Sequence, residues 1–422
     1  MRWTTRIAAA ALIAILQACA TPPAQTPPPP AAIAEARPPV TILISIDGFR
    51  ADYLQRGVTP NLSRLTAEGI TGPMRPSFPS KTFPNHWTLV TGMVPDHHGI
   101  VGNRMEDPAH PGETFTTAND APYWWNAAQP IWVAAEKAGI HTGTVLWPGA
   151  NVAWGSSATK ADHGDYPGGI RPRDWLQYNQ AISNKQRVDT ALDWLRRPPS
   201  NRPRFLTLYF DRVDMVGHDH GPDSPEVTQA VAQIDAQIGA LVDGLAVLHQ
   251  PANLVVVSDH GMSETSDTRV VTLDLPADSY HLIEAGPFAA LDPLPGKEAL
   301  VEKTLLGRHP HMECWRKAEI PARLRYGTNP RIAAIFCLAE PRWMIQEKRP
   351  EAPFTHGEHG YDNRAPDMAA LFIAAGPAFG HGTVAAFDNV DVYPLLRDLL
   401  GLPPRADVDG DDAPFRPLLR SR

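Results

Sequence analysis

Acidic and imidazole side chains follow several apolar runs of this sequence, at the points where the runs end. Asp47 comes directly after VTILISI, and the pair Asp259 and His260 follows LVVVS. Asp214 and His218 lie just beyond FLTLYF, at an i, i+4 spacing that would place both on one face of a helical turn. Carboxylate and imidazole groups without thiolates suit zinc best among the common ions, with manganese possible. The pattern therefore predicts a metal site.

Apolar runs rich in β-branched residues are typical of strands that are buried on both faces of a parallel sheet. The runs that predict such strands are residues 40–46, 205–210, 254–258 and 369–374. Helical patterns lie between them, and the clearest begins at Ser224 and Pro225 with its apolar residues on one face. This alternation predicts a doubly wound α/β fold, with a mostly parallel sheet and helices on both faces. Ligands bind beyond the carboxyl ends of such strands, so we expect the metal-site residues to converge there.

One part of the chain departs from this alternation. Between about residues 294 and 366 the pattern is less regular, with a helix-like stretch at 298–306 and a short apolar run at 332–338. We interpret it as a small inserted α+β lobe within a catalytic domain of residues 40–405. Residues 406–422 are interpreted as a C-terminal tail, after a closing helix in DVYPLLRDLLGLPP.

The first residues have the pattern of an export signal. Arg2 and Arg6 precede an apolar run that is too short to span a bilayer comfortably, so residues 1–18 predict a signal peptide. The run ends in LQAC, which resembles the lipobox of bacterial lipoproteins, in which a cysteine, here Cys19, is lipidated. A plain signal peptide is the alternative. Residues 19–39 are rich in proline and predict an extended tether. We expect an exported, periplasmic protein that is anchored to the outer membrane through Cys19, its only membrane contact.

Composition excludes some classes of partner. The formal charge of −8 comes from 46 acidic and 38 basic residues without a strongly basic block, which argues against binding to duplex nucleic acid. A small anionic substrate would need a local cationic centre, and no protein partner is predicted. Besides Cys19, the chain has Cys314 and Cys337, which in an exported protein predict a disulfide, with two buried thiols as the alternative.

Five segments, read in order, resemble the nucleotide pyrophosphatase/phosphodiesterase family of the alkaline phosphatase superfamily. They are ILISIDGFR, SFPSKTFPNHWTLVTGMVPDHHGIVGN, YFDRVDMVGHDHGP, VVVSDHGM and GEHGYDN. The resemblance covers about residues 40–402, and on it the chain is identified as a bacterial exported member. It implies an alkaline-phosphatase-like fold. It also implies a hydrolase of phosphodiester and phosphoanhydride bonds in small nucleotides, which releases nucleoside 5′-monophosphates.

The resemblance further implies roles for particular residues. Two zinc ions would be held, one by Asp47, Thr82, Asp259 and His260, and the other by Asp214, His218 and His359. Thr82 would be the nucleophile and form a covalent threonyl-phosphate, and Asn103 would donate a hydrogen bond to a phosphate oxygen. A threonine hydroxyl is a poor nucleophile, so coordination by zinc would lower its pKa. Taken alone, Thr82 would be explained equally well as a helix N-cap, and His260 as a core histidine.

Aromatic residues lie where nucleotide-cleaving members of the family have a slot for the base. They are Phe83, Trp147, Tyr178 and Tyr209. Two facing rings can stack any base. Tyr209 lies within a predicted buried strand, so the alternative is that its ring belongs to the hydrophobic core. Asn151 stands where those members often have an acid, which leaves the base preference open.

Other activities remain as alternatives. A lysophospholipid or choline phosphodiesterase belongs to the same family. A phosphomonoesterase or sulfatase is disfavoured, because alkaline phosphatases use serine and sulfatases use a modified residue in a CxPxR-type motif, whereas SFPSKTFPN contains Thr82. A non-catalytic surface lipoprotein is disfavoured because the intact ligand set would otherwise be an unpaired charge cluster.

Overall fold

The computed structural model of the chain describes residues 37–158 and 166–420. The predicted signal peptide, Cys19 and residues 20–36 of the predicted tether lie outside this described part. The described residues belong to one unit, which begins at Arg37.

A sheet of eight strands, in the order β20-β2-β19-β9-β1-β8-β6-β7, forms the centre of this unit. β1 (Val40–Ile46) lies between β8 (Phe205–Phe210) and β9 (Ala252–Val257) and is parallel to both. β19 (Phe372–Ala375) runs antiparallel to β9. Most of the other neighbouring strands are parallel, so the sheet is mostly parallel, as predicted. The outer strands are β2 (Ile70–Thr71), β6 (Thr142–Val145), β7 (Asp174–Leu176) and β20 (Gly382–Thr383).

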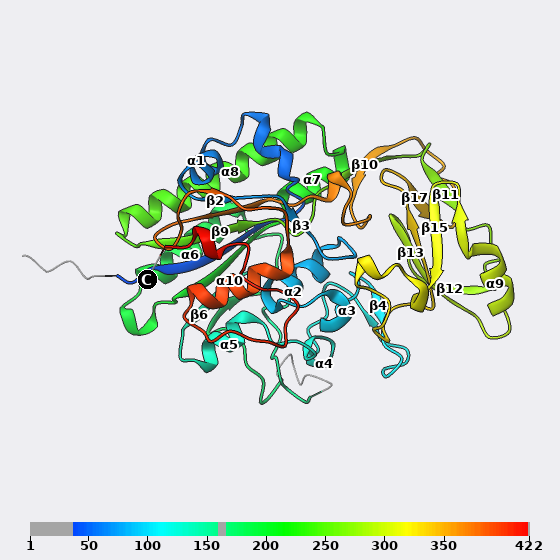
Figure 1. Ribbon diagram of the computed structural model, residues 1–422, viewed down its shortest axis with the longest axis horizontal. Helices are drawn as coiled ribbons and strands as arrows, with labels where there is room; N and C mark the ends of the chain where they lie inside the picture. Colours follow the sequence, from blue (N-terminus) through cyan, green and yellow to red (C-terminus); the bar gives the residue numbers. More distant parts are fainter. Residues whose placement is uncertain (1–36, 159–165, 421–422) are drawn as a thin grey trace, which may run out of the picture. The chain divides into compact units, whose positions relative to one another are not determined.

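Helices cover both faces of this sheet (Figure 1). Alternate residues of β1 enter different hydrophobic cores: Ile42 and Ile44 pack into one, and Leu43 into the other. The helices on the Ile42 side are α1 (Pro60–Glu68), α6 (Asn184–Arg196), α7 (Arg212–His220) and α8 (Pro225–Val247). Those on the Leu43 side include α2 (Thr82–Thr91), α5 (Ile131–Lys137) and α10 (Val392–Leu399). The central strands β1 and β8 are buried along their whole length and are mostly apolar, since both of their faces are covered.

Helix α8 begins where the sequence predicts. The Ser224 side chain accepts a hydrogen bond from the backbone N–H of Val227, and Pro225 occupies the first turn. Of the described helices, α8 alone is long and apolar enough to cross a membrane by length and composition. Its Ile234 and Ile238 are fully buried against the sheet, as in the core helix of a globular domain.

A second, antiparallel sheet forms the inserted lobe, with strand order β12-β13-β16-β15-β14. Its elements are β12 (Tyr280–Glu284), β13 (Phe288–Pro293), α9 (Glu298–Leu305), β14 (Gly307–His309), β15 (Met312–Arg316) and β16 (Ile335–Ala339). The sheet begins at Tyr280, so the predicted boundary at residue 294 is too late. A register shift between Leu282 and Glu284 breaks the alternation of β12, which removes the period-two signal of a strand.

Two other predictions concern single segments. Cys314 and Cys337 lie directly opposite one another on β15 and β16 and form a disulfide, so the alternative of two thiols is wrong.

Residues 406–420 are not a free tail, because Phe415 is fully buried and packs against the rings of Phe372 and Phe387. A single buried ring has no periodicity, so the sequence pattern could not reveal it.

Replacing Asp235 of α8 by alanine should lower the free energy of unfolding by about 2–3 kcal/mol. Asp235 is 2% exposed and accepts hydrogen bonds from the backbone N–H groups of Leu62 at 2.8 Å and Asn61 at 3.1 Å. The substitution leaves these two amides at the start of α1 without an acceptor. Urea unfolding measures the loss. Asp243→Ala, on an exposed position of the same helix, should cost no more than about 0.5 kcal/mol, and equal losses would contradict the prediction.

Candidate metal centre and active site

The predicted strand-end residues meet at one edge of the central sheet. Asp47 follows β1, the pair Asp259 and His260 follows β9, and Asp214 and His218 lie in α7, directly after β8. The three strands are neighbours and parallel, so their carboxyl ends lie at the same edge. The sheet order therefore brings together segments that are far apart in the sequence.

One group of side chains surrounds Nε2 of His260. This atom lies 2.9 Å from Asp259 Oδ2 and 3.5 Å from Asp47 Oδ1. The hydroxyl oxygen of Thr82, the first residue of α2, lies 3.2 Å from the same nitrogen. Asp47, Asp259 and His260 are all buried and offer ligand atoms within 4.8 Å of one another. This is the group that the family resemblance assigns to one metal ion.

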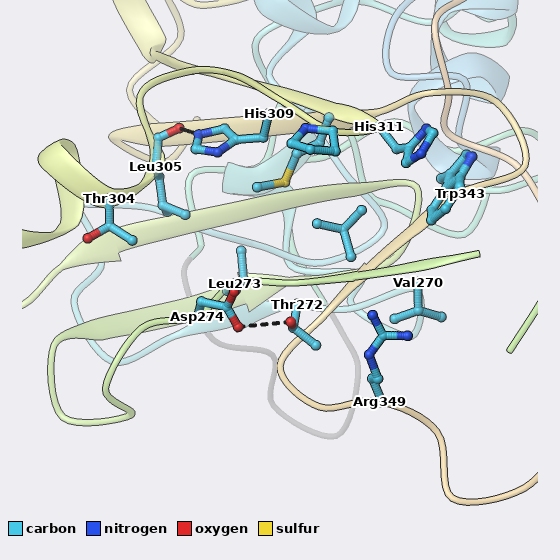
Figure 2. Close-up of a pocket in the computed structure, with 13 residues that line it drawn as sticks. Val270, Thr272, Leu273, Asp274, Thr304, Leu305, His309, His311, Trp343 and Arg349 are labelled. Atoms are coloured by element: carbon cyan, nitrogen blue, oxygen red, sulfur yellow. Dashed lines mark hydrogen bonds between the residues drawn. The ribbon is translucent and has the colours of Figure 1, made fainter. Parts of the chain in front are cut away.

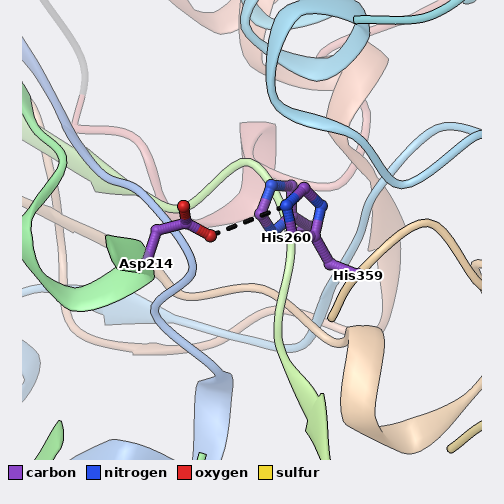
Figure 3. A group of neighbouring side chains, drawn as sticks. All are labelled: Asp214, His260 and His359. Carbon is purple, nitrogen blue, oxygen red and sulfur yellow. Dashed lines mark ion pairs between the residues drawn. The ribbon is translucent and has the colours of Figure 1, made fainter. Parts of the chain in front are cut away.

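A second group adjoins the first. Nε2 of His359 lies 3.1 Å from Nε2 of His218 and 3.7 Å from Asp214 Oδ1, and His218 Nε2 lies 3.4 Å from Asp214 Oδ2. The rings of His260 and His359 are stacked, with centroids 3.5 Å apart. Figure 3 shows this stack facing the carboxylate of Asp214. His260 therefore lies between the two groups and has ligand atoms close to both.

The three imidazole rings are oriented in the same way. Each Nδ1 lies near a backbone carbonyl oxygen, at 2.9 Å for His218, 2.9 Å for His260 and 3.0 Å for His359. A carbonyl oxygen only accepts, so each Nδ1 carries a hydrogen and each ring directs its Nε2 toward the cluster. Burial lowers the pKa of His359, which keeps that ring neutral. This orientation by backbone carbonyls is common for histidines that bind metal ions.

Buried carboxylate oxygens face the Nε2 atoms of these three histidines. Asp47 Oδ1, Asp214 Oδ1 and Asp259 Oδ2 are buried and have no hydrogen-bond partner among the described residues. Asp259 Oδ2 lies 2.9 Å from His260 Nε2, and the negative charge of Asp259 raises the pKa of His260 against the opposing effect of its burial. Burial and the charges of Asp259 and Asp214 raise the pKa of Asp47. Unpartnered carboxylate oxygens grouped this closely in a buried site favour a bound cation, so the residues fit a metal centre with oxygen and nitrogen ligands.

Two of the predicted aromatic residues support this centre from the protein interior. Tyr209 is 6% exposed, and its hydroxyl donates a hydrogen bond of 2.5 Å to Asp47 Oδ2. Trp147 is 2% exposed and packs edge-on against His86, whose Nδ1 donates to the carbonyl oxygen of Thr82. The assignment of Trp147 and Tyr209 to a slot for a base stays a prediction, and in this structure both rings are buried. Both rings are enclosed because they lie at or beside strands that are covered on both faces.

The other predicted residues lie at the accessible side. Phe83 is half-buried against Phe115 and Trp125, and Tyr178 is 44% exposed. Asn103 Oδ1 accepts a hydrogen bond of 2.9 Å from the backbone N–H of Phe83. This bond orients the amide of Asn103 and leaves its Nδ2 hydrogens available to another acceptor.

A buried lysine beside Thr82 was not predicted. Lys81 is 8% exposed, and its Nζ lies 3.5 Å from Oε1 of Glu284 in β12 and 4.0 Å from Oε2 of Glu358. The inserted lobe thus contributes an acidic partner to the loop that carries Thr82. Burial raises the pKa of Glu284, although Lys81 opposes this shift. Glu284 stands in a segment without a motif, so the sequence had no signal for this contact.

A cavity of about 430 Å³ lies elsewhere, in the region of the inserted lobe (Figure 2). Val270, Leu305 and Trp343 are among its lining residues. No residue of the metal cluster lines this cavity, so we place the chemistry at the cluster, where the functional groups converge.

Comparisons with known proteins agree with this geometry. A family model described as type I phosphodiesterase / nucleotide pyrophosphatase matches residues 41–362. A pyrophosphatase/phosphodiesterase of Schizosaccharomyces pombe is 37% identical over 90% of this chain and 80% of its own length. Ectonucleotide pyrophosphatase/phosphodiesterase family member 1 of Mus musculus is 37% identical over 92% of this chain, which spans 43% of that relative's length.

A similar solved structure is that of murine ectonucleotide pyrophosphatase/phosphodiesterase 5. It is an inactive threonine-to-alanine variant in complex with AMP. Its sequence is 34% identical, the TM-score is 0.83, and the match covers 91% of this chain and all of that one. The same alkaline-phosphatase-like arrangement of a large, mostly parallel sheet is therefore present in both proteins.

Adding zinc to chelator-treated protein should raise its thermal midpoint, because the ion binds only the folded cluster. At a zinc concentration 100 times Kd, the expected stabilisation is about 2.7 kcal/mol. Differential scanning calorimetry measures it. His359→Ala should lose most of the gain. His281→Ala, which removes an exposed histidine paired with Glu106 outside the cluster, should keep it. An unchanged midpoint in the wild type would show that the cluster does not bind zinc.

Proposed function

We propose that this chain, which belongs to the type I phosphodiesterase / nucleotide pyrophosphatase family of hydrolases, cleaves phosphodiester and phosphoanhydride bonds of nucleotides and releases nucleoside 5′-monophosphates. The observation that carries the proposal is the position of Thr82. Its hydroxyl oxygen lies 3.2 Å from His260 Nε2, at the edge of the carboxylate and imidazole cluster. The complex of AMP with a relative's inactive threonine-to-alanine variant supports both a nucleotide ligand and a threonine nucleophile.

We propose two zinc ions as cofactors. Their ligands would be Asp47, Thr82, Asp259 and His260 for one ion, and Asp214, His218 and His359 for the other. When bound, the ions would lower the pKa of the threonine hydroxyl and neutralise negative charge on the phosphate oxygens. The clustering of these residues and their unpartnered carboxylate oxygens support this assignment.

The chain's own groups then account for the remaining steps. Thr82 begins α2, where the first amides of the helix favour an anionic oxygen. Attack of its oxygen on phosphorus forms a threonyl-phosphate and releases the leaving group, and water subsequently hydrolyses this ester. Asn103 donates from Nδ2 to a non-bridging phosphate oxygen, in the orientation set by the N–H of Phe83. Phe83 and Tyr178 contact the base, which requires exposed ring surface.

We also propose that the chain is exported and is anchored through Cys19. The basic and apolar leader, the lipobox-like LQAC and the proline-rich segment support this proposal. The mouse relative is an ectonucleotide enzyme by name, which agrees with export. The relatives compared above come from a yeast and a mouse, so the bacterial form of the anchor stays a prediction.

Hydrolysis of a substrate panel tests the proposed activity. The panel comprises thymidine 5′-(4-nitrophenyl) phosphate, ATP, a diadenosine polyphosphate, a lysophospholipid and 4-nitrophenyl phosphate. We expect turnover of the three nucleotide substrates, and none of them by Thr82→Ala, which removes the nucleophile. Thr190→Ala, on a partly buried position of α6 that is not part of the cluster, should have wild-type rates. Preferential cleavage of the lysophospholipid would favour the lipid alternative, and near-normal turnover by Thr82→Ala would show that water attacks directly.

Phe83→Ala should raise KM for nucleotide diesters by roughly one to two orders of magnitude, since stacking contributes about 1–3 kcal/mol per base. The ring lies away from the reacting phosphorus, so kcat should change little. Steady-state kinetics with a nucleotide diester and with a diester that has no base separate the effects. An equal loss on both substrates would mean that Phe83 only supports the loop of Thr82.

A further inference from the structure

Tyr178 lies on an exposed loop that few contacts hold in place. Residues 177–181, between β7 and α6, are all exposed. The Tyr178 hydroxyl donates a hydrogen bond of 2.7 Å to Asp211 Oδ2, and its ring meets that of Tyr209 with centroids 6.0 Å apart. These two contacts are the ones that join the ring to the central domain, while Gln180 also contacts it from within the loop.

A buried ion pair contacts this loop from the protein interior. Arg187 of α6 is 2% exposed, and Asp211, between β8 and α7, is 7% exposed. Arg187 Nη1 donates to Asp211 Oδ1 at 2.9 Å, and its Nε donates to the carbonyl oxygen of Ile182 at 3.1 Å. The pair therefore holds the loop at both ends, at Ile182 directly and at Tyr178 through Asp211. Both carboxylate oxygens of Asp211 are occupied, which distinguishes it from the metal-site carboxylates.

The same guanidinium also reaches the metal centre. Arg187 Nη1 donates to the carbonyl oxygen of Tyr209 at 2.9 Å, and the Tyr209 hydroxyl donates to Asp47 at 2.5 Å. One buried side chain thus sets the position of the exposed ring relative to the cluster. Burial, together with Asp211, raises the pKa of Tyr178 to about 12, so the phenol keeps the proton that it donates.

We propose that Arg187 and Asp211 are positioning residues that hold the ring of Tyr178 in place for the base of a nucleotide substrate. This inference rests on the proposed function. A ring that is fixed before binding costs less conformational entropy when the substrate arrives, so the pair contributes to substrate capture. The chemical step occurs at the cluster and does not use the hydroxyl of Tyr178.

Tyr178→Phe tests the proposal, because it keeps the ring and removes only the hydrogen bond. KM for thymidine 5′-(4-nitrophenyl) phosphate should rise roughly three- to tenfold with kcat nearly unchanged. Methyl 4-nitrophenyl phosphate has the same leaving group and no base, so its KM should stay the same. Asp211→Ala, which removes the acceptor of this bond, should produce the same split, and the double variant should add little, since both changes remove the same bond.

Tyr280→Phe is the matched control. Its hydroxyl also donates to a carboxylate, Glu347 at 2.9 Å, but in the inserted lobe, and neither substrate should be affected. An unchanged KM in Tyr178→Phe, or an equal rise for both substrates, would overturn the proposal while the hydrolase assignment stands. If the wild type cleaves neither diester, the proposed function itself fails. Thermal midpoints of the variants separate these outcomes from a loss of folding.

Discussion

The site depends on one constraint: carboxylates of like charge and several imidazole rings are held close together in a buried region, where unpaired charge is costly. The rigid carboxyl ends of β1, β8 and β9 bring Asp47, Asp214 and Asp259 into a single buried region. Backbone carbonyls fix Nδ1–H of the three histidines and so direct Nε2 inward. Burial and the like charges of Asp259 and Asp214 raise the pKa of Asp47, and a bound cation would offset these charges, so metal binding would add to the stability of the fold.

Surrounding residues hold the carboxylates of the cluster in fixed orientations. Tyr209 donates to Asp47, and the backbone N–H of Gly48 donates to Asp259 Oδ1 at 3.2 Å. These donors occupy one oxygen of each carboxylate and leave the other toward the cluster. Tyr209 therefore has a structural role at the cluster, because its hydroxyl orients the carboxylate of Asp47.

The inserted lobe and the central domain share the loop that carries Thr82. Lys81 lies between Glu284 of the lobe and Glu358, and the next residue is the candidate nucleophile. Burial makes an unpaired ammonium or carboxylate costly, so the two parts of the chain stabilise each other through this contact. The lobe is thereby part of the site's framework, even though the family motifs lie outside its sheet.

The sequence by itself determined the fold class and the crossover helix from Ser224, and it predicted the strand-end acids and histidines that the structure brings together. Continuous apolar runs and strand-end acids are local signals, and five ordered motifs reinforce one another. Only the tertiary structure decided which aromatic rings are enclosed, where the lobe begins, and that Phe415 belongs to the core. Only the structure revealed the ion pair between Lys81 and Glu284 and the hydrogen bond between Tyr178 and Asp211. Burial and contacts between distant segments depend on how elements pack, and packing leaves no local period in the chain.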